Sequence, residues 1–222
     1  NLRRGTGKGN FGERQKILWY QVIYLTICYV LENTLYINVT NRCTNRCSFC
    51  VRDKDCGIGD VNLWLEKEPT VEEMIEDIKR FNPQRDDEVV FCGYGEPTMR
   101  LDAVLACAKF IKENFDSKIR INTNGQANLF YGENVAPRLS GLIDVVSISL
   151  NAKNAEEYDE LCKSIYGKES FQGLIDFAKE CKKVVPEVVM SVVDVLPPED
   201  IEACRKIAED AGARLRVRDL IE

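Results

Sequence analysis

Three cysteines, Cys43, Cys47 and Cys50, lie within eight consecutive residues in the pattern C-x3-C-x2-C. Asn, Arg, Thr and Ser surround them, so they do not form the apolar face expected of buried structural thiols. Three thiolates on one short loop can hold three irons of a cubane [4Fe–4S] cluster, whereas an electron-transfer cluster takes four cysteine ligands. The fourth iron would then be free to bind another molecule. The spacing therefore favours chemistry at the cluster over electron storage.

Two other interpretations of these cysteines stay open from spacing alone. Zinc takes cysteine ligands with gaps of similar length, and Cys56 follows closely enough to supply a fourth thiolate. A site closed by Cys56 would make the protein a non-catalytic module that binds a metal through four cysteines or transfers electrons. The thiols could also be inert.

The cysteine motif follows an alternating, β-branched run at residues 34–40, which predicts a strand. Further strands are expected at 88–92, 118–122, 143–150, 187–195 and 214–218. Helices are expected between them at 71–81, 101–115, 133–140, 154–165, 171–184 and 199–211. Strands that alternate with helices predict right-handed βαβ units and a parallel sheet. Residues 34–222 are therefore expected to form one α/β domain.

Residues 1–33 are expected to be an N-terminal extension of this domain. Five basic residues and one acidic residue precede position 17, and an apolar run follows at 17–31. A basic lead before an apolar run is typical of a signal peptide, but this run is short for a membrane span and lacks a small-residue cleavage site. An extra strand or covering segment, a non-native or disordered leader, and a membrane or export role all stay open.

Composition excludes several classes of function. The net charge of −6 and the pI near 5.0 give no support for bulk binding to nucleic acid. The chain has no histidine, which excludes zinc sites that pair cysteines with histidines and excludes Ser-His-Asp triads. Ten cysteines in a chain of 222 residues, four of them in helical patterns, indicate reduced thiols rather than a disulfide framework. We therefore expect a cytoplasmic protein with no membrane partner.

Unusual polar segments follow each expected strand. In parallel α/β folds the carboxyl ends of the strands meet at one edge, where ligands bind. Glycines there allow close backbone approach, a carboxylate can receive an ammonium group, and amides or hydroxyls can bond a carboxylate or a ribose. Each segment alone also fits an ordinary turn or helix cap. The candidate binding residues are Gly93, Tyr94, Gly95, Glu96, Asn122, Asn124, Ser149 and Asn151.

Together with the cysteines, these segments resemble a known family. The three-cysteine motif with Phe49, followed by Gly95-Glu96-Pro97, is similar to the radical S-adenosylmethionine (SAM) enzymes. A closer resemblance, to the small TatD-associated radical SAM proteins, rests on residues 36–43, 91–98, 120–125 and 147–152. The resemblance covers about residues 34–222.

The resemblance implies a partial (β/α)6 TIM-like barrel in which Cys43, Cys47 and Cys50 bind three irons of the cluster. SAM would chelate the fourth iron. Phe49 would lie near the adenine, and the segment from Gly93 to Glu96 would receive the amino group of SAM. The contacts implied for the methionine and ribose portions are Asn122, Asn124, Ser149 and Asn151. One departure is Tyr94, which replaces the first glycine of the common Gly-Gly-Glu-Pro.

The implied activity is reductive cleavage of SAM to a 5′-deoxyadenosyl radical that abstracts hydrogen from an unknown substrate. A reductant protein of the flavodoxin or ferredoxin type would supply the electron. We expect no added cysteine-rich domain after the last strand at 214–218. The barrel would then stay open on one side, which favours a macromolecular substrate.

Overall fold

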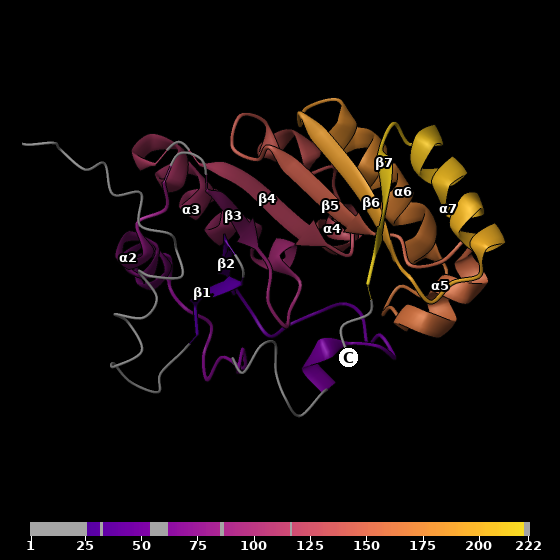
Figure 1. Ribbon diagram of the computed structural model, residues 1–222, viewed down its shortest axis with the longest axis horizontal. Helices are drawn as coiled ribbons and strands as arrows, with labels where there is room; N and C mark the ends of the chain where they lie inside the picture. The colour runs from indigo at the N-terminus through magenta and orange to yellow at the C-terminus, as the bar shows by residue number, and fades with distance from the viewer. Residues whose placement is uncertain (1–25, 32, 54–61, 85–86, 116, 220–222) are drawn as a thin grey trace, which may run out of the picture.

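The computed structural model describes residues 26–31, 33–53, 62–84, 87–115 and 117–219. Its strands form one sheet in sequence order, with β1 antiparallel to β2 and all later neighbours parallel (Figure 1). The strands are β1 (Cys28–Leu31), β2 (Thr34–Ile37), β3 (Glu88–Phe91), β4 (Lys118–Thr123), β5 (Val145–Ser149), β6 (Glu187–Val193) and β7 (Arg214–Arg218). The sheet is not closed within the described residues. This confirms the expected α/β fold with a parallel, partial barrel.

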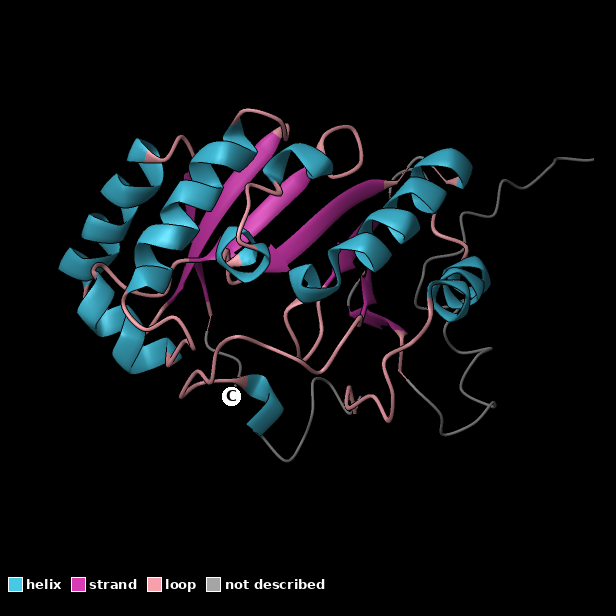
Figure 2. Cartoon of the chain, turned by 180° about the vertical axis from the view of Figure 1, so that it is seen from behind, coloured by secondary structure: helices cyan, strands magenta, loops and turns pink. Residues whose placement is uncertain are grey.

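The helices connect the parallel strands and cover one face of the sheet, as Figure 2 shows from behind. The α-helices are α2 (Val71–Phe81), α3 (Leu101–Asn114), α4 (Ala127–Tyr131), α5 (Ala155–Cys162), α6 (Glu169–Lys182) and α7 (Pro198–Asp210). Three short 3-10 helices are η1 (Val51–Asp53), η2 (Pro97–Arg100) and η3 (Ala136–Leu139). Among the described residues, no helix is long and apolar enough to cross a bilayer.

Two helix predictions need correction. Of the helix expected at 133–140, the structure forms only the short 3-10 helix η3 at 136–139, and the separate short helix α4 precedes it. The left-handed Gly132 ends α4 as its C-cap, and Pro137 lies in the first turn of η3. The helix expected at 154–165 ends at Cys162, because Lys163 takes a left-handed conformation as its C-cap. The early end of α5 leaves its last carbonyl groups available to another segment.

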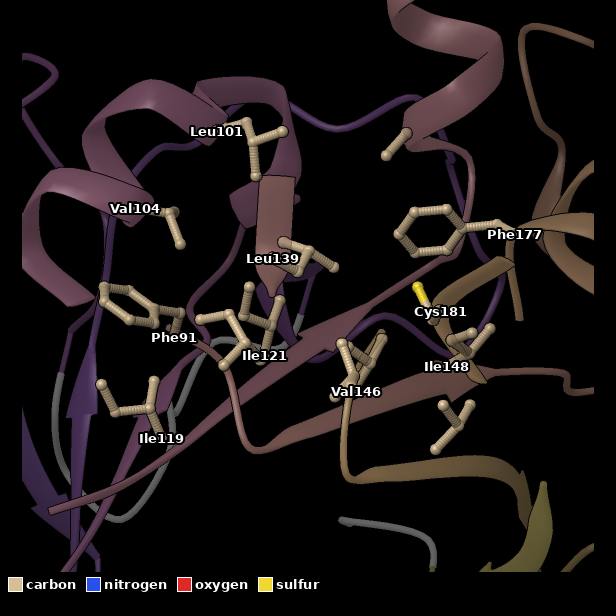
Figure 3. Close-up of a cluster of buried hydrophobic side chains, with 14 of the residues drawn as sticks. Phe91, Leu101, Val104, Ile119, Ile121, Leu139, Val146, Ile148, Phe177 and Cys181 are labelled. Atoms are coloured by element: carbon tan, nitrogen blue, oxygen red, sulfur yellow. The ribbon is translucent and has the colours of Figure 1, made fainter. Parts of the chain in front are cut away.

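The helix-facing side of the sheet forms the main core. Side chains alternate along a strand, so Phe91, Ile121 and Ile148 point toward the helices and pack near Leu101 and Phe177 (Figure 3). All five are at most 1% exposed. This layer holds the helices on one face of the sheet, and the alternate residues of the strands lie on the other face.

The antiparallel strand β1 lies within the expected N-terminal extension. Each of its residues pairs with one of β2, from Cys28 with Ile37 to Leu31 with Thr34. The boundary expected after residue 33 therefore falls between two paired strands of one sheet. Residues 1–25, which include the basic lead and most of the apolar run, lie outside the described residues.

Candidate active site

The loop that carries the three cysteines, residues 41–53, lies along the carboxyl edge of the sheet and against the end of α5 (Figure 1). The backbone amides of Arg46 and Ser48 donate to the carbonyls of Cys162 and Leu161, at 2.9 and 3.0 Å. The carbonyl of Thr44 accepts from the amide of Ile165 at 2.9 Å. The first two bonds use carbonyl groups that the end of α5 leaves without partners within the helix. The cysteine loop is therefore fixed to α5 by main-chain contacts.

A buried polar network centred on Gln126 supports the cysteine loop. Gln126, which is 2% exposed, follows β4 and accepts at Oε1 from the hydroxyl of Thr44 at 2.8 Å. Its Nε2 donates to Oδ1 of Asn45 at 2.8 Å and to the hydroxyl of Tyr158 at 3.1 Å. Oε1 also accepts from Ser164 at 3.0 Å. One amide thus connects the cysteine loop to α5 and to the turn beyond it.

The glycine-rich segment after β3 touches the same loop through its backbone. The amide of Glu96 donates to the carbonyl of Arg42 at 2.7 Å. A Cβ at Gly95 would lie 2.2 Å from the carbonyl oxygen of Thr40 and 2.6 Å from that of Arg42. Any side chain at this position would push the cysteine loop away. Gly95 is therefore needed for close approach.

The carboxylate of Glu96 is buried and fully engaged within the protein. Its Oε1 accepts from the amide and hydroxyl of Thr98, at 3.0 and 2.6 Å, and from the hydroxyl of Thr123 at 2.7 Å. Its Oε2 accepts from the amide of Asn124 at 2.7 Å. Burial raises the pKa of Glu96, and these hydrogen bonds oppose the rise. Glu96 joins the ends of β3 and β4.

The three cysteine thiols are half-buried and none forms a disulfide. Burial raises the pKa of Cys43 to about 12, and the nearby Glu96 charge contributes to the rise. Burial also raises the pKa of Cys50. Iron binds the thiolate and displaces its proton. The metal must therefore supply the energy to ionise these thiols.

A fourth thiol stands beside the loop, and the sequence pattern did not single it out. Cys162, the buried last residue of α5, shares a side-chain hydrogen bond with Cys47. This bond raises the pKa of Cys47 and lowers that of Cys162. Asn151 Nδ2 donates to the Cys162 sulfur at 3.6 Å, and Tyr158 also bonds it. A helical cysteine in an apolar pattern gives no sequence signal for this contact.

The donor set of the loop fits a cubane cluster. Within the described ranges, no three Cys, Asp or Glu side chains are grouped so that they could share one metal ion. Thiolates around a single zinc must converge at about 2.3 Å from it, whereas three ligands of a cubane each bind a different iron. Three free thiols on one loop meet that second requirement. Cys56, the expected fourth ligand of a closed site, lies outside the described residues.

The predicted SAM contacts gather at the same edge. Asn124 Nδ2 donates to the hydroxyl of Thr44 at 2.7 Å and lies 3.9 Å from the sulfur of Cys43. Asn151, in a left-handed conformation, bonds Cys162 through its side chain and the Ser191 carbonyl through its amide at 3.2 Å. The side-chain amide of Asn124 therefore supports the cysteine loop, and that of Asn151 supports Cys162 beside the loop.

The remaining predicted contacts lie around this centre. Asn122, at the end of β4, bonds the thiol of Cys92. Ser149 ends β5 and is half-buried, and Phe49 packs partly against the core. Tyr94 is buried in a small hydrophobic cluster with Tyr29 and Leu63, against which Tyr36 packs, and Gly93 lies against Asn38. Contact of each with SAM stays a prediction.

Comparison with known proteins places this site in a class. A family model of the radical SAM superfamily matches residues 37–211, well over half of the chain, and the chain belongs to this superfamily. The matched range contains the three cysteines and every predicted SAM contact. Membership in this superfamily confirms the expected class of enzyme and its cofactors, SAM and a [4Fe–4S] cluster.

A relative from Methanocaldococcus jannaschii, named as a candidate glycyl-radical enzyme activating enzyme, is 29% identical over 172 residues. The match covers 76% of this chain and 65% of the relative. A radical SAM methyltransferase from Sphaerobacter thermophilus has a TM-score of 0.62 at 16% identity, over 86% of this chain and 57% of that chain. The maturase HydG from Carboxydothermus hydrogenoformans has a TM-score of 0.60 at 16% identity, and the match covers 96% of this chain and 49% of HydG. The chain thus spans less than two thirds of these relatives, and the structural matches establish the fold.

Proposed function

We propose that the protein is a radical SAM enzyme in which Cys43, Cys47 and Cys50 hold a site-differentiated [4Fe–4S] cluster. When bound, the cofactors supply one-electron cleavage of SAM to methionine and a 5′-deoxyadenosyl radical that abstracts hydrogen from a substrate. The observation that carries this proposal is the position of the cysteine loop. The loop lies at the carboxyl edge of the sheet and is fixed there by α5, Gln126 and the segment after β3.

The chain would bind SAM with groups that are already held rigid. The carboxylate of Glu96 already accepts hydrogen bonds from Thr98, Thr123 and Asn124. The ammonium group of SAM would therefore bind the backbone carbonyl oxygens from Gly93 to Gly95 instead. Ser149 and Asn122 offer polar groups to the ribose and methionine portions. Phe49 offers an aromatic face to the adenine.

We also propose that the substrate is a macromolecule and that a flavodoxin- or ferredoxin-type protein delivers the electron. The name of the Methanocaldococcus relative supports a protein substrate. The face of the sheet that the described helices do not cover supports access for a large partner (Figures 1 and 2). Residues 36–43, 91–98, 120–125 and 147–152 support placement in the TatD-associated group. The nine described cysteines, all free, support a reducing compartment such as the cytoplasm.

The test is anaerobic reconstitution with iron and sulfide, followed by reduction with dithionite in the presence of SAM. The expected result is about four irons per chain and 5′-deoxyadenosine, identified by mass. A loaded cluster or bound zinc without 5′-deoxyadenosine would contradict the proposal and favour the module closed by Cys56. The Cys56→Ala variant separates the two, because it keeps its iron only if the site is open.

A further inference from the structure

Cys47 is held against the last residue of α5 by the main chain on both of its sides. The amide of Arg46, the residue before it, donates to the carbonyl of Cys162 at 2.9 Å. The amide of Ser48, the residue after it, donates to the carbonyl of Leu161 at 3.0 Å. Main-chain segments joined by hydrogen bonds lie on the order of 5 Å apart, which is within the range of Cα separations that a disulfide spans. The backbone geometry therefore suits a covalent bond between Cys47 and Cys162.

The two thiols also meet through their side chains. Cys47 and Cys162 share a hydrogen bond, and neither forms a disulfide in this structure. Asn151 Nδ2 donates to the sulfur of Cys162 at 3.6 Å, which holds that sulfur in place. Cys162 is fully buried, whereas Cys47 is half-buried. The pair therefore combines one thiol that a small reagent can reach with one that solvent does not reach.

A buried helical cysteine needs no partner thiol in order to pack well. Cys181 is such a residue near the end of α6, where it lies in the main core (Figure 3). Cys162 belongs to the same core, but it also contacts the thiol of a proposed cluster ligand. Packing alone accounts for Cys181 and leaves the contact between Cys162 and Cys47 unexplained.

We propose that Cys47 and Cys162 are a redox modification site, and that hydrogen peroxide converts them to a reversible disulfide when the cluster is absent. This inference rests on the proposed function, in which the cluster occupies Cys47 and keeps it from other reactions. Peroxide first oxidises the more exposed Cys47 thiol to a sulfenic acid, and its O–O bond breaks to release one water. The sulfur of Cys162 then attacks the sulfenic sulfur. An S–S bond forms, the S–O bond breaks, and the hydroxide leaves with the thiol proton as a second water. The two sulfurs lose two electrons, which reduce the peroxide.

The disulfide protects the cluster site from irreversible damage. A sulfenic acid with no neighbouring thiol is oxidised further to a sulfinic acid, which thiol reductants do not restore. Bond formation with Cys162 stops the oxidation of Cys47 at a stage that a dithiol reverses by exchange. While the disulfide lasts, Cys47 cannot bind iron. The pair therefore switches the chain between a stored state and a state ready to receive its cluster.

Peptide mapping of the reconstituted wild-type chain, exposed to hydrogen peroxide until its iron is released, tests the proposal. Free thiols are blocked with iodoacetamide, and the chain is digested with trypsin without reduction. Cleavage after lysine and arginine leaves Cys47 in peptide 47–52 and Cys162 in peptide 154–163. These two peptides should appear as a disulfide-linked pair. Peptide 47–52 also contains Cys50, so the cluster-free Cys50→Ser chain is mapped in parallel and should give the same pair. Absence of the pair from either chain would overturn the proposal.

A second measurement tests whether the disulfide is protective. Dithiothreitol should restore to the peroxide-treated wild type most of the iron that it bound before treatment. Cys162→Ser at the same peroxide dose should carry sulfinic acid at Cys47 and regain a smaller share of its own initial iron. Cys181→Ser, which places the same hydroxyl in a buried helix, should behave like the wild type. Equal sulfinic acid at Cys47 in the wild type and Cys162→Ser would contradict protection by Cys162.

The mapping separates this inference from the function on which it rests. The cluster-free chain forms the disulfide without iron or SAM, so the same peptides are analysed whether or not the enzyme is active. A wild type that gives the linked pair but no 5′-deoxyadenosine would contradict the proposed function alone. A wild type that gives 5′-deoxyadenosine but no linked pair would overturn this inference alone.

Discussion

The side-chain amide of Gln126 donates to Oδ1 of Asn45 at 2.8 Å, across 81 residues of sequence. The same amide reaches Thr44, Tyr158 and Ser164. Each bond holds a group that touches the cysteine loop or α5. Gln126 is therefore a positioning residue for the cluster ligands.

Replacing Gln126 by Ala should loosen the loop and destabilise the fold. Several buried polar groups would lose a partner, which costs about 3 kcal/mol in total. We expect a lower urea midpoint and faster loss of iron to a chelator. Asn128→Ala, in α4 two residues after Gln126 and at a half-buried site bonded to Val135, is the matched control and should retain iron. Equal iron retention in the two variants would contradict a positioning role for Gln126.

Cys47→Ala should abolish cluster binding, because only two of the three loop thiolates would remain. Cys162→Ser is the matched variant, since serine can keep hydrogen bonds with Asn151 and Tyr158. We expect it to bind iron with an affinity reduced by about tenfold, as for other groups that orient a metal ligand. Iron and sulfide content with electron paramagnetic resonance of the reduced cluster checks both variants. If Cys162→Ser lost iron as completely as Cys47→Ala, Cys162 would be a ligand and the site would be closed.

Gly95→Ala should displace the cysteine loop. The new methyl group would meet the backbone oxygens of Thr40 and Arg42 at 2.2 and 2.6 Å. Backbone atoms cannot rotate away as side chains do, so we expect a loss of about 3 kcal/mol in unfolding free energy. Gly173→Ala on α6 would meet only the Leu129 side chain. Its effect should stay within about 1 kcal/mol, because alanine favours the helix. Similar urea curves for the two variants would argue against the close approach.

Glu96→Gln should destabilise the junction between β3 and β4. A glutamine NH2 in the place of Oε2 would face the amide N–H of Asn124, which now donates to the carboxylate at 2.7 Å. Two donors would then oppose each other in a buried position, at a cost of about 2–3 kcal/mol. Thermal or urea unfolding of the apo protein measures the loss without any effect of the cluster. Unchanged stability would contradict the assigned network.

Glu187 gives a prediction for the dependence of stability on pH. Its hydrogen bond with Arg214 lowers its pKa below the usual value of 4.5. The ionised group therefore stabilises the fold above that value, and the contribution disappears as the pH falls through the folded-state pKa. Glu187→Gln should be less stable than the wild type at pH 7, by under about 1 kcal/mol because the pair is partly exposed. The difference in unfolding free energy between the wild type and Glu187→Gln should disappear as the pH falls toward ~3. A gap that widened in acid would contradict the ion pair.

The alternation of residue types was sufficient to predict every parallel strand. Apolar residues at every second position, with glycine and proline between runs, place Val89 and Phe91 toward the helices because burial of apolar surface dominates. The same pattern placed the cysteine motif after the first parallel strand, at the edge where ligands bind. At 133–140 the structure forms only the short 3-10 helix η3, because the left-handed Gly132 ends α4 before it and Pro137 lacks a backbone N–H to donate.

The sequence by itself determined the α/β order, the three-cysteine motif and its place at the carboxyl edge, because these depend on local spacing and on strand period. The tertiary structure alone decided which distant groups meet that motif. Gln126 and Cys162 reach the loop from far along the chain. The physical reason is that periodicity determines the face on which a side chain lies, whereas the twist and curvature of the packed sheet determine which side chains meet.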